Sequence, residues 1–198
     1  MGAVVLLSSS AARAQFIVPN SYTSTPGQGT AQGGGFNYFD DGGVQLTDNI
    51  LGVNDFAANL GNGPAQEWVG WLTVDPAMSF NFSAPVNITQ VQIGFNRNQG
   101  SGIFLPSTVT INGTPFSLAG TELADNTRGF LNFNTNFTGT SLGVSLADSS
   151  TGRWIFVDEV RFVGAAVTAA PEPGTFALTG IGLLLGGGAF AARRRRKA

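Results

Sequence analysis

The feature that most constrains the fold of this chain is an alternation of apolar and polar residues in short runs. Nearly every second residue is apolar in four such runs, at 78–82, 91–96, 131–137 and 141–146. A period of two places the apolar side chains on one face of a β-strand. No helical period of ten residues appears before residue 176, and turn residues separate the runs. The sequence therefore predicts an all-β fold, an antiparallel β-sandwich.

Two local patterns refine this prediction. Asn112-Gly113 stands between two apolar runs and is typical of a two-residue hairpin turn. The last predicted strand covers residues 153–163, where Asp158 has the same parity as four large apolar residues, Trp154, Phe156, Val160 and Phe162. Because a buried carboxylate is costly without a partner, we expect either a β-bulge here or a partner for the carboxylates of this strand.

The amino-acid composition excludes several chemistries. Cysteine and histidine are absent from all 198 residues, which rules out disulfides, thiolate nucleophiles, the Ser-His-Asp triad and histidine metal sites. A bound metal would need oxygen ligands, which favours calcium or magnesium. A glycosidase needs only two carboxylates, but acidic residues are frequent enough for such a pair to arise by chance. We therefore predict that the protein is not an enzyme.

Charge is distributed unevenly along the chain. Residues 15–168 contain four arginines and eleven acidic residues, a net charge of −7. A segment this acidic repels a phosphate backbone, so we expect no nucleic-acid partner. Half of the ten basic residues lie instead in one run near the C-terminus, at 193–197.

That basic run follows an uncharged apolar segment, residues 176–192. As a helix this segment would be about 26 Å long, at the low end of what crosses a bilayer. The sequence predicts a transmembrane helix at 176–192 and a basic cytoplasmic tail at 193–198, in which Arg193, Arg194, Arg195 and Arg196 act as the membrane stop. The alternative is a buried core helix. Residues 165–175 form a linker that carries Pro171, Glu172 and Pro173.

This order of Pro-Glu-Pro, apolar helix and arginine cluster resembles the PEP-CTERM sorting signal of Gram-negative bacteria. Ala170 stands where that family usually has valine. The resemblance implies processing by an exosortase-type enzyme and export, from an inner-membrane-anchored precursor to the cell surface, the outer membrane or the extracellular matrix. Many members of the family accompany exopolysaccharide or biofilm production.

The N-terminal region fits export as well. Residues 1–14 contain an apolar run at 3–7 and Ala12-Arg13-Ala14, which is typical of a signal-peptide cleavage site. We interpret them as a signal-peptide remnant; the alternative is an ordinary disordered N-terminus. Residues 15–35 are rich in Ser, Thr, Gly, Pro and Gln, which predicts a flexible segment before the sandwich at 36–164.

A second resemblance concerns the sandwich itself. The runs 46–49 and 67–71, with the last strand, are similar to the galactose-binding-like jelly roll of discoidin-type and carbohydrate-binding domains. The resemblance implies a structural Ca²⁺ between an early loop and the last strand, with Asp48 and Glu159 as its ligands near the carbonyl of Leu46. The alternative is that Glu159 pairs with Arg161 or Arg153 and Asp48 caps a turn.

Aromatic and guanidinium groups are the candidates for contact with a sugar. Trp71, with Trp68 beside it, could stack on a sugar face, while Arg97 and Arg128 could donate to sugar hydroxyls. The alternative places the tryptophans in the core and leaves the arginines solvated or ion-paired. We predict a non-enzymatic exported surface or matrix protein in contact with extracellular polysaccharide. The alternative function is a dedicated carbohydrate-binding module with a defined sugar pocket.

Overall fold

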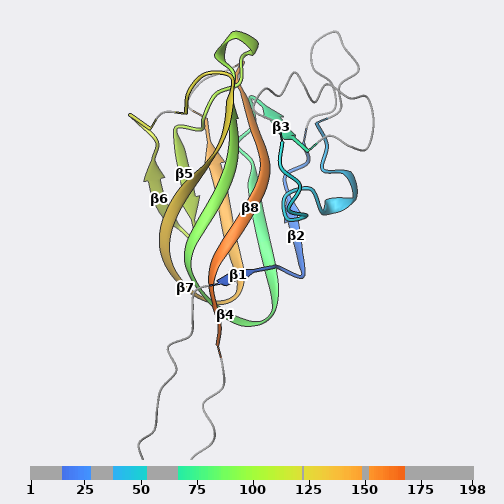
Figure 1. Ribbon diagram of the computed structural model, residues 1–198, viewed down its shortest axis with the longest axis vertical. Coiled ribbons are helices and arrows are strands. Elements are labelled where there is room, and N and C mark those ends of the chain that lie inside the picture. Colours follow the sequence, from blue (N-terminus) through green and yellow to red (C-terminus); the bar gives the residue numbers. More distant parts are fainter. Residues whose placement is uncertain (1–14, 28–37, 53–66, 122, 149–151, 168–198) are drawn as a thin grey trace, which may run out of the picture. The chain divides into compact units, whose positions relative to one another are not determined.

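The computed structural model describes residues 15–27, 38–52, 67–121, 123–148 and 152–167, and Figure 1 shows the course of the chain. Eight strands form one hydrogen-bonded sheet. They are β1 Gln15–Ile17, β2 Ser21–Ser24, β3 Val69–Leu72, β4 Ala77–Arg97, β5 Thr108–Ile111, β6 Thr114–Ser117, β7 Thr127–Ala147 and β8 Trp154–Ala166. All pairs between these strands are antiparallel. Helical structure in the described residues is limited to two short 3₁₀ turns, η1 Asp41–Gly43 and η3 Gln99–Ser101. The predicted all-β antiparallel class is confirmed.

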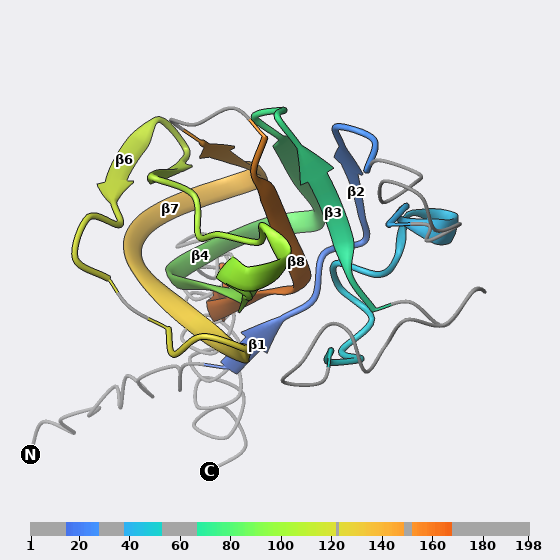
Figure 2. The same ribbon diagram turned by 90° about the horizontal axis from the view of Figure 1, so that it is seen from above.

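The two longest strands, β4 and β7, give the sheet its two layers. The first part of β4 pairs with β2 and with the end of β7. The end of β7 pairs in turn with β5, and β5 pairs with β6. The second part of β4 pairs with β8 and with the beginning of β7. The register shifts between Asn81 and Val86, where both strands turn over from one layer to the other. Figure 2 shows β7 curving around the interior. Both ends of β4 and β7 therefore lie at the same end of the domain (Figure 1).

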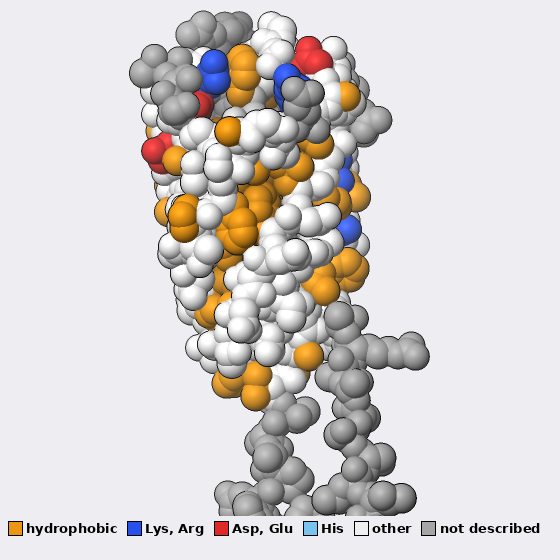
Figure 3. All heavy atoms as spheres, turned by 90° about the vertical axis from the view of Figure 1, so that its left-hand side faces the viewer, with side chains coloured by type: hydrophobic (Ala, Val, Ile, Leu, Met, Phe, Trp, Pro, Cys, Tyr) orange, Lys and Arg blue, Asp and Glu red, His pale blue; other side chains and the backbone are white. Residues whose placement is uncertain are grey.

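A hydrophobic core fills the space between the layers. Phe80 and Phe82 from the first layer meet Phe162 of β8 edge-on, with ring centroids 4.9 and 5.4 Å apart. Phe116 of β6 meets Phe133 of β7 in the same way, at 5.5 Å. The apolar residues of the four alternating runs are buried or half-buried, so the predicted inward faces are confirmed. Figure 3 shows the side of β5, β6 and β7, where a diagonal band of apolar side chains crosses a face that is otherwise mainly backbone and polar side chains.

The predicted hairpin turn is also confirmed. Asn112 and Gly113 join β5 to β6 and have φ angles of 47° and 83°. Positive φ at both turn positions matches the right-handed twist of the two strands, and Asn and Gly tolerate that conformation best.

In two places the sequence-based prediction was wrong. Residues 15–27, predicted as a flexible segment, contain β1 and β2, which add to β8 and β4. These strands are short and lie at edges of the sheet, so few of their side chains are buried and polar residues are common. Within β2 only Tyr22 is buried. The sandwich therefore begins before residue 36, and it continues to Ala166 in β8.

The second difference concerns the faces of β8. Gly94 of β4 pairs with Glu159, and the next residue, Phe95, pairs with Val157, so Asp158 is the extra residue of a β-bulge. A bulge reverses the alternation. Ile155 and Val157 before it, and Val160 and Phe162 after it, consequently face the main core. Trp154 and Phe156 belong instead to a second buried cluster on the other side of β8, with Tyr38, Trp68 and Ile103.

Several predicted segments lie outside the described residues. These are the signal-peptide remnant at 1–14, the motif Pro171, Glu172 and Pro173, the apolar segment 176–192, and Arg193 to Arg196. Within the part of the chain that is described, no helix has the length and apolar character needed to cross a membrane.

Candidate functional site

A cavity of about 390 Å³ opens at the end of the domain where both ends of β4 and β7 lie. Three connections surround it: the β4–β5 loop, the β6–β7 loop and the β7–β8 loop. We call it the loop cavity, and its wall includes Arg97, Gln99, Phe104, Ser117, Asp148 and Arg153. Backbone hydrogen bonds hold these loops together, from Ser107 to Ala147 (2.8 Å) and from Leu118 to Ser107 (2.9 Å).

Arg153 gives the loop cavity a planar cationic group. Its guanidinium lies over the ring of Phe104, 4.2 Å from the ring centroid. The backbone on both sides is fixed, because Phe104 donates to the carbonyl of Trp154 (2.9 Å) and Thr73 donates to the carbonyl of Arg153 (3.2 Å). A guanidinium held over an aromatic face is restricted in its movement, while its N–H groups remain able to donate. Arg153 is therefore a hydrogen-bond donor held in place by Phe104.

Arg97 is the second guanidinium of the loop cavity. It is the last residue of β4, and one of its N–H groups donates to the carbonyl of Leu123 in the β6–β7 loop. The neighbouring loop is anchored as well, since Gln99 donates its backbone N–H to Asp125 (2.8 Å). Neither Arg97 nor Arg153 forms an ion pair with a described residue. Arg97, a candidate sugar-binding residue in the sequence analysis, lies in this wall, and its binding role stays a prediction.

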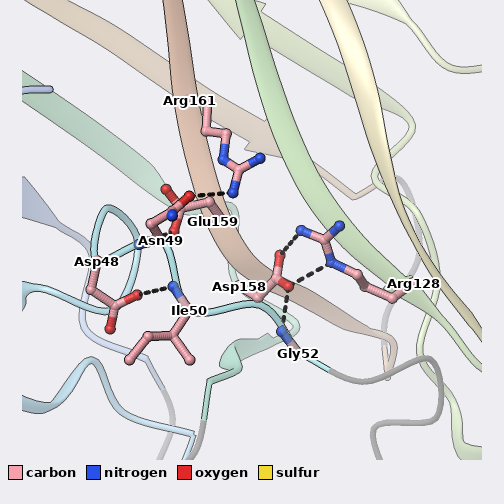
Figure 4. Close-up of polar contacts among 8 residues, drawn as sticks. All are labelled: Asp48, Asn49, Ile50, Gly52, Arg128, Asp158, Glu159 and Arg161. Atoms are coloured by element: carbon pink, nitrogen blue, oxygen red, sulfur yellow. Dashed lines mark hydrogen bonds and ion pairs between the residues drawn. The ribbon is translucent and has the colours of Figure 1, made fainter. Parts of the chain in front are cut away.

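Arg128 lies elsewhere, on the outer face of the layer that contains β8 (Figure 4). Its Nε and Nη2 donate to the two oxygens of Asp158, at 2.7 and 3.1 Å. The backbone N–H of Gly52 donates to the same carboxylate at 2.7 Å. Asp158 is fully buried. Burial raises the pKa of this carboxyl, and the bonds from Arg128 oppose the rise. Both expectations for Asp158, a bulge and a partner, are confirmed.

Gly94 makes this ion pair sterically feasible. Arg128 on β7 and Asp158 on β8 are on opposite sides of β4, and they meet above Gly94. A Cβ atom at position 94 would overlap Asp158 Oδ1 and crowd Arg128 Nη2. Phe130 continues this outer surface, with Arg128 4.0 Å and Arg161 4.7 Å from its ring centroid. We call Gly94, Arg128, Phe130, Asp158, Glu159 and Arg161 the outer-face cluster.

Glu159 joins the early loop to β8. Its Oε2 accepts a hydrogen bond from the backbone N–H of Asn49 at 2.8 Å, and Arg161 donates to the side chain of Asn49. The carboxyl group is almost fully buried, and burial raises its pKa to about 7. The bond from Asn49 and the charge of Arg161 oppose this rise, whereas Asp48 and Asp158 add to it.

The predicted calcium ligands are already engaged in this loop. Asp48 accepts from the backbone N–H of Ile50 at 2.9 Å, which caps the turn (Figure 4). The carbonyl of Leu46 accepts from Val160 at 2.7 Å. The carboxylates of Asp48 and Glu159 and the carbonyl of Leu46 together offer fewer oxygens than the roughly six to eight that Ca²⁺ takes as ligands. In the described part of the chain, no group of three or more acidic side chains is arranged so that it could hold a metal ion. The fit to calcium is incomplete, and hydrogen bonds close the loop on β8.

Both tryptophans of the run 67–71 lie in the interior. Trp71 is fully buried in the main core and donates its indole N–H to the carbonyl of Thr25 at 2.9 Å. Trp68 packs in the second cluster against Phe156. In this structure Trp71 therefore has no indole face to offer a sugar, and the alternative interpretation, tryptophans in the core, describes both residues.

Sequence reasoning did not single out Phe104, and it considered Arg153 only as a partner for Glu159. The two residues are 49 positions apart in the sequence and meet only because the β4–β5 and β7–β8 loops come together. One signal was available: Arg153 is one of only four cations in an acidic body and precedes a strand directly.

A second cavity, of about 270 Å³, lies between β1, the early loop and β8. Its wall is mainly apolar and includes Phe16 and Val18, which are 60% and 73% exposed. Glu159 and Arg161 are the ionisable residues of its described wall. The loop cavity differs because two guanidiniums there stand against one described carboxylate, Asp148.

No known protein family matches this sequence, and no curated protein matches it. Solved structures resemble it with low sequence identity. The family 32 carbohydrate-binding module of C. perfringens NanJ, in complex with galactose, is 11% identical, with a TM-score of 0.44; the match covers 76% of this chain and 99% of that one. A Streptococcus pneumoniae fucose-binding module is 11% identical, with a TM-score of 0.46 over 79% of this chain and 99% of that chain.

The family 32 module of AlyQ, in complex with 4,5-unsaturated mannuronic acid, is also 11% identical, with a TM-score of 0.45 over 75% of this chain and 97% of that chain. These proteins are carbohydrate-binding modules, and this chain is similar to them in the course of its strands. With TM-scores below 0.5, the similarity by itself assigns no ligand to this chain.

Proposed function

We propose that this protein is an exported, non-enzymatic β-sandwich of the galactose-binding-like jelly-roll class that binds extracellular polysaccharide in the loop cavity. The observation that carries the proposal is the stacked pair Arg153 and Phe104, which holds a planar donor at a cavity wall. Sugar-binding sites combine an apolar surface with a few fixed polar groups. Arg97, Gln99 and Ser117 supply further polar groups in the same wall.

The volume of the loop cavity, about 390 Å³, lies within the range typical of small-ligand sites. Its polar groups are held on hydrogen-bonded loops between long strands, so little ordering is needed when a ligand binds. Catalysis by a carboxylate pair has weak support, because the described wall contains one carboxylate, Asp148. The proposal therefore includes binding without turnover.

Export and sorting rest on the sequence alone. The order of Pro171-Glu172-Pro173, an apolar segment and four arginines favours processing by an exosortase-type enzyme and delivery to the cell surface, the outer membrane or the matrix. If the protein is associated with exopolysaccharide or biofilm, the polysaccharides that we propose as ligands of the loop cavity would surround it.

Glycan binding by the purified full-length protein tests the binding proposal. On an array of bacterial and plant polysaccharides we expect selective binding that Arg97→Ala weakens about ten-fold or more, the usual effect of losing a charged hydrogen-bond donor. Arg161→Ala removes the same charge outside the loop cavity and is the matched control. Equal weak binding to every glycan, or equal loss in both variants, would contradict the proposal. Release of reducing ends from a bound glycan would contradict the non-enzymatic part.

The sorting proposal has its own experiment in the native host. Replacement of Pro171, Glu172 and Pro173 by alanine is expected to leave the full-length precursor in the membrane fraction. An unchanged ratio of precursor to processed protein on immunoblots would refute the role of this motif.

A further inference from the structure

The charges of the loop cavity indicate which kind of sugar it takes. The domain carries a net charge of −7 between residues 15 and 168, and it contains only four arginines. Two of these four, Arg97 and Arg153, lie in the wall of one cavity. Their grouping runs against the overall negative charge of the domain and favours an anionic ligand at this wall.

The two guanidiniums keep most of their hydrogen-bonding capacity. Each has five N–H donors. In the described structure Arg97 donates to one carbonyl, that of Leu123, and Arg153 lies over Phe104 without a carboxylate partner. Arg128 has the opposite situation, since the buried carboxylate of Asp158 occupies its fork. Among the described residues of the wall, one carboxylate, Asp148, stands beside these two guanidiniums, so the wall keeps a positive charge that an anionic ligand can satisfy.

The chemistry of that anion follows from the geometry of the donors. A guanidinium presents two parallel N–H groups that match the two oxygens of a carboxylate. The contact with Phe104 restricts the movement of the Arg153 side chain, which lowers the cost of ordering it when a carboxylate binds. Gln99 and Ser117 in the same wall can bond neutral hydroxyls. A uronic acid, a sugar with both hydroxyls and a carboxylate, satisfies all of these groups.

We infer that the loop cavity recognises a uronic acid residue of an acidic polysaccharide, with Arg153 and Arg97 binding its carboxylate. This inference rests on the proposed function and narrows it to a substrate class. Asp148 in the same wall opposes this binding, because its carboxylate repels any carboxylate held nearby, and the two guanidiniums have to outweigh that repulsion.

The experiment compares matched sugars on the full-length protein by isothermal titration calorimetry. Oligomers of galacturonate, mannuronate and glucuronate are each paired with the same oligomer after reduction of its carboxyl groups to alcohols. We expect at least one uronate oligomer to bind about ten-fold more tightly than its reduced counterpart, with the difference shrinking at high salt. A sulfated galactan oligomer forms a third arm and is expected to bind more weakly.

Three variants assign the preference to the loop cavity. Arg97→Gln combined with Arg153→Gln removes both guanidiniums and is expected to bind the acidic and reduced oligomers equally. Arg153→Lys, which keeps the charge but lacks the planar fork, should retain only part of the preference. Arg161→Gln removes a charge in the outer-face cluster and should retain all of it. Circular dichroism and melting of each variant establish that it is folded.

Each other outcome overturns a specific part of the inference. Equal affinity for acidic and reduced oligomers in the unmodified protein would show that the carboxylate is not the recognised group. The proposed function would not be affected by that result. Tighter binding of the sulfated oligomer than of every uronate oligomer would exclude a uronic acid as the preferred ligand. A preference that survives the loss of both Arg97 and Arg153 moves the recognition away from the loop cavity. Absence of binding to all oligomers and to the polysaccharide array overturns the proposed function itself.

Discussion

The four arginines of the sandwich lie two by two in different surroundings, and only Arg128 forms an ion pair with a described residue. In the outer-face cluster, Arg128 is held by the buried carboxylate of Asp158, and Arg161 bonds Asn49 and lies over Phe130. In the loop cavity, Arg97 and Arg153 face solvent-accessible space and form no ion pair with a described residue. The difference teaches that the partner of an arginine, more than its presence, separates a structural role from a binding role.

The largest effect on stability is expected when the ion pair of the outer-face cluster is broken. Arg128→Leu leaves the carboxylate of Asp158 buried without its cation, which typically costs about 3–5 kcal/mol. Arg153→Leu, in contrast, removes no ion pair and is expected to cost at most about 1 kcal/mol. Urea unfolding of both variants measures the two values. Similar losses in both would break the division of the arginines into two roles.

A double variant sharpens this result. Arg128→Leu combined with Asp158→Leu removes both charges, so it is expected to recover part of the stability that the single variant loses. No recovery would mean that packing of the Arg128 side chain, rather than its charge, stabilises the outer face.

The next largest effect is expected at Gly94. Gly94→Ala introduces a Cβ atom into the space where Arg128 meets Asp158, and overpacking of this kind costs about 1–3 kcal/mol. Gly143→Ala is the control, because nothing lies within 4 Å of the Cβ position there. Thermal melting of the two variants should separate them clearly; equal melting temperatures would show that the ion pair shifts at little cost.

A smaller effect concerns pH. Burial raises the pKa of Glu159 from 4.5 to about 7, so the folded protein holds this proton more tightly than the unfolded chain does. The stability it contributes is present below about pH 4.5 and is lost as the pH rises through about 7. Glu159→Gln should therefore melt with a weaker dependence on pH in this window. Parallel melting curves of the two proteins against pH would contradict the role of Glu159.

The smallest expected effect is that of calcium at Asp48 and Glu159, which stays a prediction. Hydrogen bonds from Asn49 and to Asp48 already close the loop on β8, so a bound ion adds little. Calcium is expected to raise the melting temperature of the unmodified protein slightly and to leave Glu159→Gln unchanged. The same shift in both proteins would remove Glu159 as a ligand.

The fold class and its strands could be predicted where one face is buried and the other is polar. The run 91–96 is an example, because Val91, Ile93 and Phe95 face the core. β1 and β2 were missed because they are short edge strands with few buried residues. The faces of β8 were assigned wrongly because a bulge at Asp158 reverses the alternation, and residues 154–160 are all buried.

For the candidate site, the sequence indicated Arg97 and left the tryptophans open between two roles. It could not join Phe104 to Arg153, or Arg128 to Asp158, because each pair comes from different strands or loops. Such contacts depend on sheet register and on the turn-over of β4 and β7, which no local pattern encodes.

By itself, the sequence determined that this protein is an acidic all-β chain without cysteine or histidine chemistry, because alternation and composition are local properties. Only the tertiary structure decided which arginines are bound by carboxylates and which remain available to a ligand. The physical reason is that the environment of a charge depends on the groups within a few ångströms of it, and these come from distant parts of the chain. Asp158 reaches Arg128 across β4, whereas no described carboxylate pairs with Arg153.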